Sequence, residues 1–284
     1  MKEIKEIDGD LWFVENDRGT MKIWYKVRHV LYEKQTPYQH LAILDLYDYG
    51  RTLVLDGVIQ TTELDASIYN EMLIHVPMVI GRDIRNVLII GAGAGGVIRE
   101  ALKYAFVERV DVVEIDEEVL RACLREMPGL SGGLSDARVH MHFVDGKQFV
   151  ADEAVKGMYD LVIIDASDPE GPSEALFAPA FYADVRSALR EGGLLSCQSE
   201  SLVFYRELTQ SVRSNLQRLF PVVETATYPM PSYPGGIWTM TLASTKYCLA
   251  DADFTRLAAE TCYIQKESFA SYFRLPPVIK GGMV

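Results

Sequence analysis

Two carboxylates three residues apart, Asp165 and Asp168, stand in the stretch DASDPEGP at residues 165–172. The apolar run before them, residues 161–164, is typical of a strand buried on both faces of a parallel sheet. Side chains at the carboxyl end of such a strand lie where open α/β sheets bind ligands. One carboxylate can take a proton from an ammonium nucleophile while the other holds the remaining positive charge. Capping of a helix near Ser173 would explain one of the acids but not both.

A glycine-rich turn, GAGAGG at residues 91–96, follows another apolar run and precedes an amphipathic stretch. Gly91, Gly93 and Gly96 satisfy the GxGxxG pattern of a nucleoside-binding turn, and Glu114 ends the next apolar run. A carboxylate at that place can accept both hydrogen bonds from a ribose diol. The pattern alone is compatible with a structural turn, a dinucleotide site or a site for an S-adenosylmethionine-type sulfonium.

Two further features favour the sulfonium nucleoside over a dinucleotide. A nicotinamide domain usually opens its chain with the glycine turn, whereas 85 residues precede the strand of this turn. Asp145 and Gly146 follow the third apolar run, where the acid can accept a hydrogen bond from an adenine amine. A sulfonium nucleoside carries no phosphate, so the helix after the turn need not be an anion site.

The composition is that of an ordinary globular protein of 284 residues with a formal charge of −12. Phosphate neutralisation needs a face rich in Lys and Arg, so this charge argues against nucleic-acid binding. An acidic surface suits a cationic substrate or simply maintains solubility. The four cysteines lie far apart with no histidine at ligand spacing, which predicts reduced core residues and no metal site. The charged opening and the lack of a long apolar run predict a cytoplasmic protein without a membrane span.

The elements that would position these residues fall into two parts, and we expect domains of residues 1–64 and 65–284. Residues 11–63 alternate apolar and polar side chains in short runs separated by turn residues, which predicts a small antiparallel sheet. No long helix is expected before Asp65. A mostly helical stretch begins there and ends near Pro77.

The second part changes to short apolar runs, each followed by an amphipathic helix. This pattern predicts a doubly wound α/β domain with a mostly parallel sheet, of the S-adenosylmethionine-dependent transferase type. Residues 225–228 and 237–243 have the pattern of an antiparallel edge pair. The predicted parallel strands are 87–90, 110–113, 139–142, 161–164 and 194–196.

Several longer motifs occur together in one known family. They are Tyr38-Gln39, LDGVIQTTE at 55–63, YNEMLIHVP at 69–77, VEID at 113–116, the acidic loop at 165–172 and YPGG at 233–236. With these motifs the chain resembles the polyamine aminopropyltransferases, the spermidine synthase family, over nearly its whole length.

The resemblance implies an enzyme that transfers an aminopropyl group from decarboxylated S-adenosylmethionine to a diamine such as putrescine, releasing methylthioadenosine. The donor would be a cosubstrate, with no permanently bound cofactor, and the chain would form a homodimer or homotetramer. Asp165 would be the general base that deprotonates the amine. The methylthioadenosine part of the donor would be held beside the glycine turn by Gln39, Glu114, Asp145, Gly146 and Pro172. The amine would be held by Tyr69, Asn70, Asp168 and Tyr233.

The glycine turn departs from the family at Ala94, where an aspartate that faces the donor's ammonium group is usual. The chain could keep aminopropyl transfer, with Asp165, Asp168 and Glu200 supplying the negative charge. It could instead accept intact S-adenosylmethionine for carboxyaminopropyl or methyl transfer, or bind a nucleoside or polyamine without turnover. The retained pair Asp165 and Asp168 favours catalysis on a cationic amine. His75 is expected to be a buried residue at a helix end.

Overall fold

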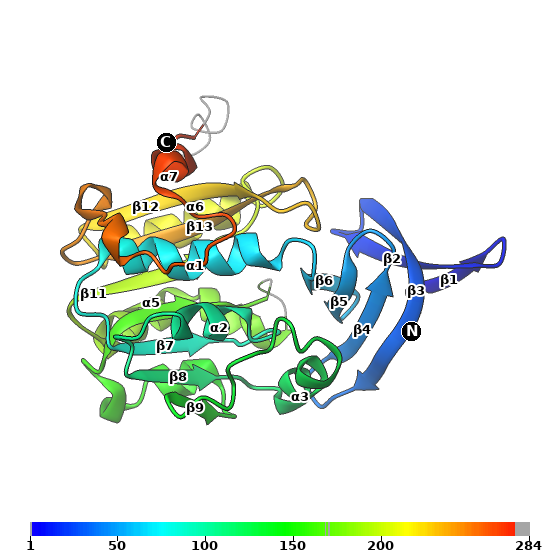
Figure 1. Ribbon diagram of the computed structural model, residues 1–284, viewed down its shortest axis with the longest axis horizontal. Coiled ribbons are helices and arrows are strands. Elements are labelled where there is room, and N and C mark those ends of the chain that lie inside the picture. Colours follow the sequence, from blue (N-terminus) through cyan, green and yellow to red (C-terminus); the bar gives the residue numbers. More distant parts are fainter. Residues whose placement is uncertain (1, 168, 170, 276–284) are drawn as a thin grey trace.

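Two sheets lie side by side in the computed structural model, which describes residues 2–167, 169 and 171–275 (Figure 1). The N-terminal sheet has six strands that pair antiparallel in chain order, as the alternating pattern predicts. Its strands are β1 (Ile4–Ile7), β2 (Asp10–Asp17), β3 (Met21–Gln35), β4 (His40–Leu46), β5 (Gly50–Leu55) and β6 (Val58–Thr62).

The N-terminal sheet begins earlier than the sequence analysis predicts. Strand β1 pairs with β2 through a tight hairpin whose turn residues, Asp8 and Gly9, have φ values of 52° and 82°. Two successive positive φ angles are the conformation of a type I′ turn, for which Asp-Gly is a preferred sequence. The prediction missed β1 because the charged residues around this turn hide its apolar alternation.

The second sheet has seven strands in the order β12-β13-β11-β10-β7-β8-β9. Strands β7 to β11 run parallel, and β13 and β12 add an antiparallel edge beside β11, which confirms the predicted doubly wound sheet. The chain moves outward from β7 on one side and from β10 on the other, so these two strands form the topological switch point. The strands are β7 (Asn86–Ile90), β8 (Arg109–Val113), β9 (Val139–His142), β10 (Tyr159–Ile164), β11 (Leu189–Gln198), β12 (Val222–Pro229) and β13 (Ile237–Ser244).

Helices cover both faces of this sheet because successive strand residues point to opposite sides. Val87 and Ile89 of β7 pack in one core with α1 and α2, whereas Leu88 and Ile90 pack in another with α5 and α6. The helices are α1 (Ala66–Ile80), α2 (Gly96–Leu102), α3 (Glu117–Glu126), α4 (Gly146–Val150), α5 (Pro179–Ala188), α6 (Arg206–Gln217) and α7 (Lys266–Tyr272). Short 3-10 turns cover Glu153–Val155, Gly171–Phe177, Leu249–Asp251 and Phe254–Arg256.

Helix α1 continues past Pro77, where the sequence predicted its end. Proline lacks an amide hydrogen and normally weakens a helix interior. Here the three residues after it, Met78–Ile80, are fully buried, and the Gly81 amide closes the helix by donating to the Pro77 carbonyl at 2.8 Å. Burial of this apolar turn offsets the missing hydrogen bond. As a result His75 is buried as predicted, but it lies within the helix and not at its end.

Helix α3 joins the two sheets by packing against β3 and β4 of the N-terminal sheet (Figure 1). The shared apolar core includes Leu41, Ile43, Leu53, Val119 and Cys123. At its rim, Glu118 accepts hydrogen bonds from the Tyr32 hydroxyl at 2.5 Å and from the Lys34 ammonium at 2.7 Å. Residues of both sheets are therefore held in fixed positions around the space between them.

The prediction that all four cysteines are core residues is wrong for two of them. Cys123 and Cys197 are buried, but Cys248 is partly exposed and Cys262 is exposed, and all four are free thiols. Cys262 lies in the segment before α7, where its backbone amide donates to the buried Glu71.

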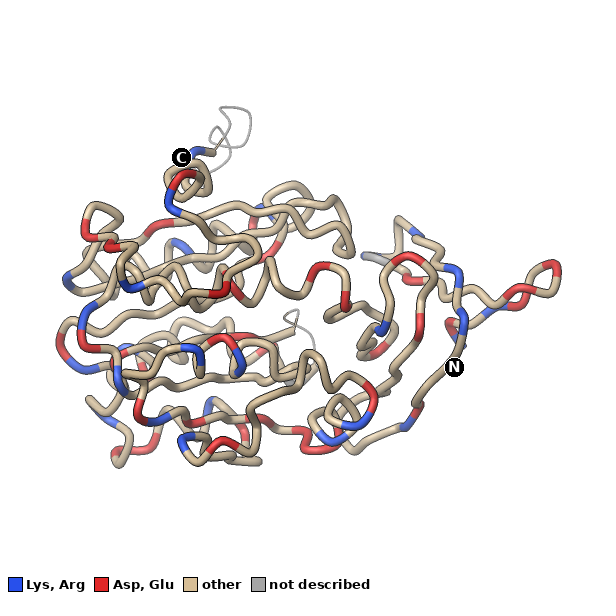
Figure 2. Tube along the Cα trace, viewed as in Figure 1, with Lys and Arg blue, Asp and Glu red and all other residues tan. Residues whose placement is uncertain are grey.

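The surface charge is mixed. Lys and Arg are interspersed with Asp and Glu along most of the described chain (Figure 2). In the described part of the chain, none of the helices combines the length and the apolar character that crossing a membrane requires.

Candidate active site

The carboxyl ends of β7 and β10 meet at the switch point. Ile90 pairs with Ile164 in the parallel ladder, and the next amide, that of Asp165, donates to the Ile90 carbonyl at 2.8 Å. Gly91 has a φ of 80°, and a Cβ at this position would lie 2.1 Å from the backbone oxygen of Asp165. Only glycine permits this approach. The glycine turn and the acidic loop are therefore adjacent in space.

A pocket opens at this edge of the sheet, between the ends of the parallel strands and strands β5 and β6 of the N-terminal sheet. The predicted site residues that line it are Gln39, Tyr69, Asn70, Gly91, Gly93, Glu114, Asp165 and Tyr233. The wall also includes Gln60, Gln198, Tyr205 and Trp238, which the sequence analysis did not assign to the site. Gln198 is the last residue of β11, so the rule that ligands bind at strand ends could have identified it.

Asp165 is the carboxylate at the centre of this geometry. Its Oδ1 accepts a hydrogen bond from the Tyr69 hydroxyl at 2.6 Å. Burial raises the pKa of Asp165 to about 6, although the bond from Tyr69 acts in the opposite direction. A Cβ at Gly93 would lie 3.8 Å from Asp165 Oδ2, so this second oxygen faces the glycine turn. At neutral pH the group is a carboxylate whose pKa lies close enough to the working pH for general base catalysis.

Aromatic rings line the pocket beside Asp165. Tyr69 meets Tyr228 and Tyr233 edge to face, with ring centroids 6.4 Å and 6.3 Å apart. Tyr233 in turn packs edge to face against Trp238 at 4.7 Å, and its hydroxyl donates to the Gln60 carbonyl. Aromatic faces attract organic cations, so this wall suits an alkylammonium chain.

Glu114 lies at the carboxyl end of β8, next to the glycine turn. Its Oε2 accepts from the Ala92 amide at 3.0 Å and its Oε1 from the Asp116 amide at 2.9 Å. Burial raises the pKa of Glu114, and the backbone bonds oppose that increase. A carboxylate has further lone pairs, so a diol can still bind here. Asp116 also accepts from the Gln39 amide group at 3.1 Å, which ties this predicted donor contact to the same strand end.

Asp145 and Gly146 are not part of the wall formed by the described pocket residues. Asp145 caps α4, with its Oδ1 accepting from the amides of Lys147 at 2.7 Å and Gln148 at 3.2 Å. A Cβ at Gly146 would lie 2.7 Å from the side chain of Ile90, the last residue of β7. Both residues therefore lie beside the site, at the end of the strand next to that of Glu114.

Four further predicted residues, Asp168, Pro172, Asn70 and Glu200, are described to different extents by the structure. Asp168 lies outside the described residues, and of Pro172 only its place in the 3-10 turn is described. Asn70 is buried against the start of α2, where a Cβ at Gly96 would lie 2.1 Å from its Nδ2. Glu200 is fully buried behind the wall, and Gln198 donates to its Oε1 at 3.1 Å.

Two family models match this chain. Residues 66–254 match a model described as the spermine/spermidine synthase domain, and residues 11–63 match the spermidine synthase tetramerisation domain. The first model alone covers more than half of the chain. The protein belongs to the spermine/spermidine synthase family.

Curated relatives within this family cover nearly the whole chain. It is 39% identical over 272 residues to the polyamine aminopropyltransferase of Thermoanaerobacter sp. (strain X514), covering 95% of this chain and 98% of the relative. It is 37% identical over 283 residues to the polyamine aminopropyltransferase of Methanocaldococcus jannaschii, covering 98% and 96%. The resemblance deduced from the motifs is thereby confirmed.

Solved structures of spermidine synthases share this fold along their full length. A spermidine synthase in complex with the transition-state analogue AdoDATO is similar with a TM-score of 0.93 and 31% identity, covering 100% of this chain and 98% of that chain. The spermidine synthase of Thermotoga maritima is similar with a TM-score of 0.92 and 30% identity, covering 100% and 97%.

The family's glycine turn places Ala94 in the wall of the pocket. Ala94 is 6% exposed and packs in the apolar core shared by α3 and the N-terminal sheet. Among the described lining residues the acids are Asp165 and Glu114, and there is no Lys, Arg or His. The pocket thus keeps a negative character without the usual aspartate in the turn.

Proposed function

We propose that the protein is an aminopropyltransferase that moves the aminopropyl group of decarboxylated S-adenosylmethionine to a primary amine of a diamine such as putrescine. The observation that carries this proposal is the partly buried carboxylate of Asp165, which is bonded to Tyr69 in a pocket that joins the glycine turn to an aromatic channel. Membership of the family and similarity to the aminopropyltransferases support the chemistry.

The donor's methylthioadenosine part would lie against the ends of β7 and β8. Glu114 and Gln39 would bind the ribose hydroxyls, and Gly91 and Gly93 would let the nucleoside approach the backbone. Asp145, Gly146 and Pro172 would surround the adenine. The position of Glu114 beside the glycine turn, where it accepts from the Ala92 amide, supports this arrangement.

In the transfer step Asp165 takes a proton from the substrate's ammonium group. An alkylammonium has a pKa near ~10.4 when it resembles lysine, so at neutral pH its nitrogen has no free lone pair. Burial raises the pKa of Asp165 to about 6 and so makes it a stronger base than an exposed aspartate. The freed nitrogen forms a bond to the carbon attached to sulfur as the carbon–sulfur bond breaks. Methylthioadenosine leaves with the bonding electrons.

The rest of the catalysis is positioning. A sulfonium is already a good leaving group, so the rate depends on holding nitrogen, carbon and sulfur in line. Tyr69, Tyr233 and Asn70 would hold the diamine, together with Asp168. Tyr69, Tyr233 and Asn70 line the same pocket as the proposed nucleoside contacts Gln39 and Glu114.

The charge of the pocket favours the decarboxylated donor over intact S-adenosylmethionine. The described wall contains Asp165 and Glu114 and no cationic side chain, so the carboxylate of the intact donor would be buried without a counter-charge. An unpaired buried charge costs several kcal/mol in real proteins. The decarboxylated donor has only positive groups, which these acids attract.

Release of methylthioadenosine with each donor tests this proposal. We expect release only when decarboxylated donor and amine are both present, with putrescine, agmatine and other diamines compared as acceptors. The intact donor should react at least about a hundredfold more slowly. Its unpaired carboxylate costs several kcal/mol on burial, and each 1.4 kcal/mol corresponds to a factor of ten. Release of methylthioadenosine from the intact donor alone would support carboxyaminopropyl transfer, and formation of S-adenosylhomocysteine would support methyl transfer. Tight nucleoside binding without release would support a binding protein.

We also propose the larger organisation of the molecule. Residues 1–64 would form one domain and 65–284 the catalytic domain, and copies of the chain would assemble into a homodimer or homotetramer. The match to a tetramerisation domain supports assembly through the N-terminal sheet. We infer a cytoplasmic location, and the formal charge of −12 argues against a nucleic-acid partner.

A further inference from the structure

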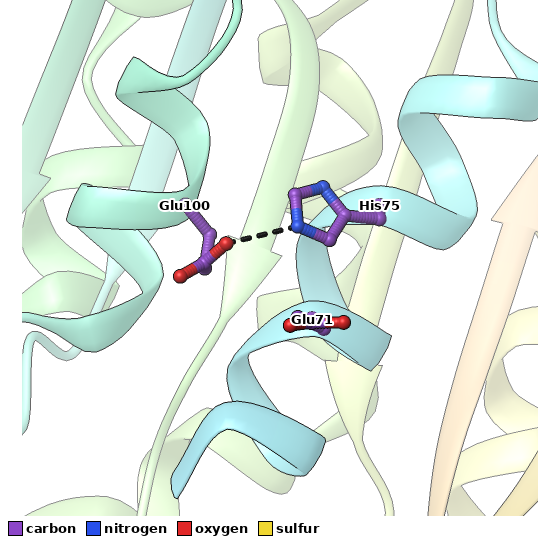
Figure 3. Close-up of side chains that lie close together, drawn as sticks. All are labelled: Glu71, His75 and Glu100. Carbon is purple, nitrogen blue, oxygen red and sulfur yellow. Dashed lines mark hydrogen bonds and ion pairs between the residues drawn. The ribbon is translucent and has the colours of Figure 1, made fainter. Parts of the chain in front are cut away.

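Helix α1 carries the site residues Tyr69 and Asn70. Its next two turns contribute to a buried polar cluster between α1 and α2 (Figure 3). The cluster consists of Glu71 and His75 of α1 and Glu100 of α2, with at most 1% of any of these residues exposed. One nitrogen or oxygen from each lies within 4.8 Å of the others. Burying such groups is costly unless each has a partner, so their partners reveal what the cluster does.

His75 connects α1 to α2 through one ring nitrogen and to the segment directly after α2 through the other. Its Nε2 lies 2.9 Å from Glu100 Oε2, and its Nδ1 lies 2.7 Å from the Tyr104 hydroxyl. Burial raises the pKa of Tyr104, so this hydroxyl keeps its proton. If the hydroxyl donates to Nδ1, then Nε2 carries the imidazole proton and donates to Glu100. Both ring nitrogens are satisfied in this arrangement.

Glu100 is neutralised by cations of its own helix. Its Oε1 accepts from Arg99 Nη2 at 3.0 Å, and its Oε2 pairs with Lys103 Nζ at 2.6 Å. Burial alone would raise the pKa of Glu100, but the bonds from His75 and Lys103 lower it to about 2. The carboxylate is therefore ionised and fully paired.

Glu71 is satisfied by backbone amides. Its Oε1 accepts from the amide of Cys262 at 2.6 Å, and its Oε2 accepts from those of Tyr263 and Ile264 at 2.9 Å each. Each ligand atom of the cluster thus already has a protein partner, and its charges balance. The geometry is that of a completed hydrogen-bond network and not of a vacant metal site.

This network links the elements that carry the two halves of the active site. Helix α2 begins directly after the glycine turn, and Glu100 lies one turn into it. Helix α1 holds Tyr69, whose hydroxyl bonds Asp165. The apolar contacts between α1 and α2 are not directional. A small shift of one helix along the other therefore costs little free energy. The His75–Glu100 bond removes that freedom.

We propose that His75 and Glu100 are positioning residues for the transfer reaction, acting through Tyr69. Their hydrogen bond fixes α1 along α2 and so holds the Tyr69 hydroxyl where it orients Asp165. This inference rests on the proposed role of Asp165 as general base. The network would therefore affect the rate of the transfer step and not the binding of the donor.

Three substitutions of His75 test the proposal. His75→Phe keeps the ring and removes both hydrogen bonds, His75→Gln places an amide near Nε2 toward Glu100, and His75→Asn places one near Nδ1 toward Tyr104. We expect kcat to fall roughly ten- to a hundredfold in the Phe and Asn variants, since displacement by about 1 Å can cost that much. His75→Gln should recover most of kcat. The KM for the donor should change less than about twofold, because none of the proposed nucleoside contacts lies on α1.

Combining His75→Phe with Tyr69→Phe distinguishes a positioning role of His75 from a general loss of stability. If His75 acts through Tyr69, His75→Phe should lower kcat less than about twofold in the Tyr69→Phe background, because residues of one unit are not additive. Asp111→Asn is the matched control. Asp111 is a buried carboxylate of β8 bonded to His142 Nε2 at 2.7 Å, and its effect on kcat should add to that of Tyr69→Phe.

Several results would overturn this inference. Additive losses for His75→Phe and Tyr69→Phe, or equal losses for His75→Gln and His75→Asn, would show that the pair only stabilises the fold. The Gln and Asn variants decide the matter if the Phe variant fails to fold. A stoichiometric metal ion that remains bound to the purified protein would replace the network by a metal site. Absence of turnover in the wild-type protein would instead refute the proposed function.

Discussion

Asp165 is held in an environment that suits a base working near neutral pH. It lies partly buried directly after β10, and burial raises its pKa to about 6. The carboxylate form is therefore present above this pH and lost below it. We predict that kcat/KM rises as the pH increases through about 6, and that Asp165→Asn lowers kcat by roughly 10² to 10⁴, as loss of a general base does. A pH profile with no inflection near 6 in the wild-type enzyme would contradict this role.

Tyr69 lowers the pKa of Asp165 through a hydrogen bond, against the larger effect of burial. The bond stabilises the charged carboxylate, so it lowers the pKa against the effect of burial. We predict that Tyr69→Phe moves the acidic limb of the kcat/KM profile to higher pH. An unchanged limb, or a shift to lower pH, would mean that the hydroxyl does not bond the titrating carboxylate in solution.

At the scale of elements, the glycine turn and the acidic loop depend on each other. A Cβ at Gly91 would lie 2.1 Å from the Asp165 carbonyl oxygen, in a backbone conformation with φ of 80°. We predict that Gly91→Ala lowers the free energy of unfolding by about 3 kcal/mol, from the left-handed conformation and the forced backbone shift together. Gly157 is the matched control, since it has φ of 65° and no atom within 4 Å. Gly157→Ala should cost only about 1–2 kcal/mol in the same denaturant unfolding experiment.

The sequence predicted most elements correctly because apolar runs and turn residues act locally. The ends of β7, β8 and β10, with the turn and acids that follow them, could be located in this way. Strand β1 and the last turn of α1 could not, since a charged hairpin and a buried proline contradict the local pattern. The hydrogen-bond partners of Glu71 and Gln39 could not be predicted either, because segments far apart in the chain supply them.

For the whole molecule, the N-terminal sheet presents apolar side chains to solvent. Trp24 is 45% exposed and Tyr47 is 48% exposed, and both line a shallow groove on this sheet. Exposed apolar groups that cluster in this way mark interaction surfaces. We predict that light scattering gives the mass of a dimer or tetramer and that Trp24→Asp reduces it. Leu124 of α3 is 46% exposed and provides the control, since Leu124→Asp should leave the mass unchanged.

The central claim is that this molecule makes a carbon–nitrogen bond between an aminopropyl group and a diamine. Mass spectrometry of the amine product, after incubation with decarboxylated S-adenosylmethionine and an isotopically labelled diamine, tests it most directly. We predict a labelled diamine that has gained one aminopropyl group, formed in equal amount with methylthioadenosine. Asp165→Asn should form it roughly 10² to 10⁴ times more slowly. A labelled diamine that stays unmodified, or that gains a methyl or carboxyaminopropyl group from the intact donor, would contradict the claim.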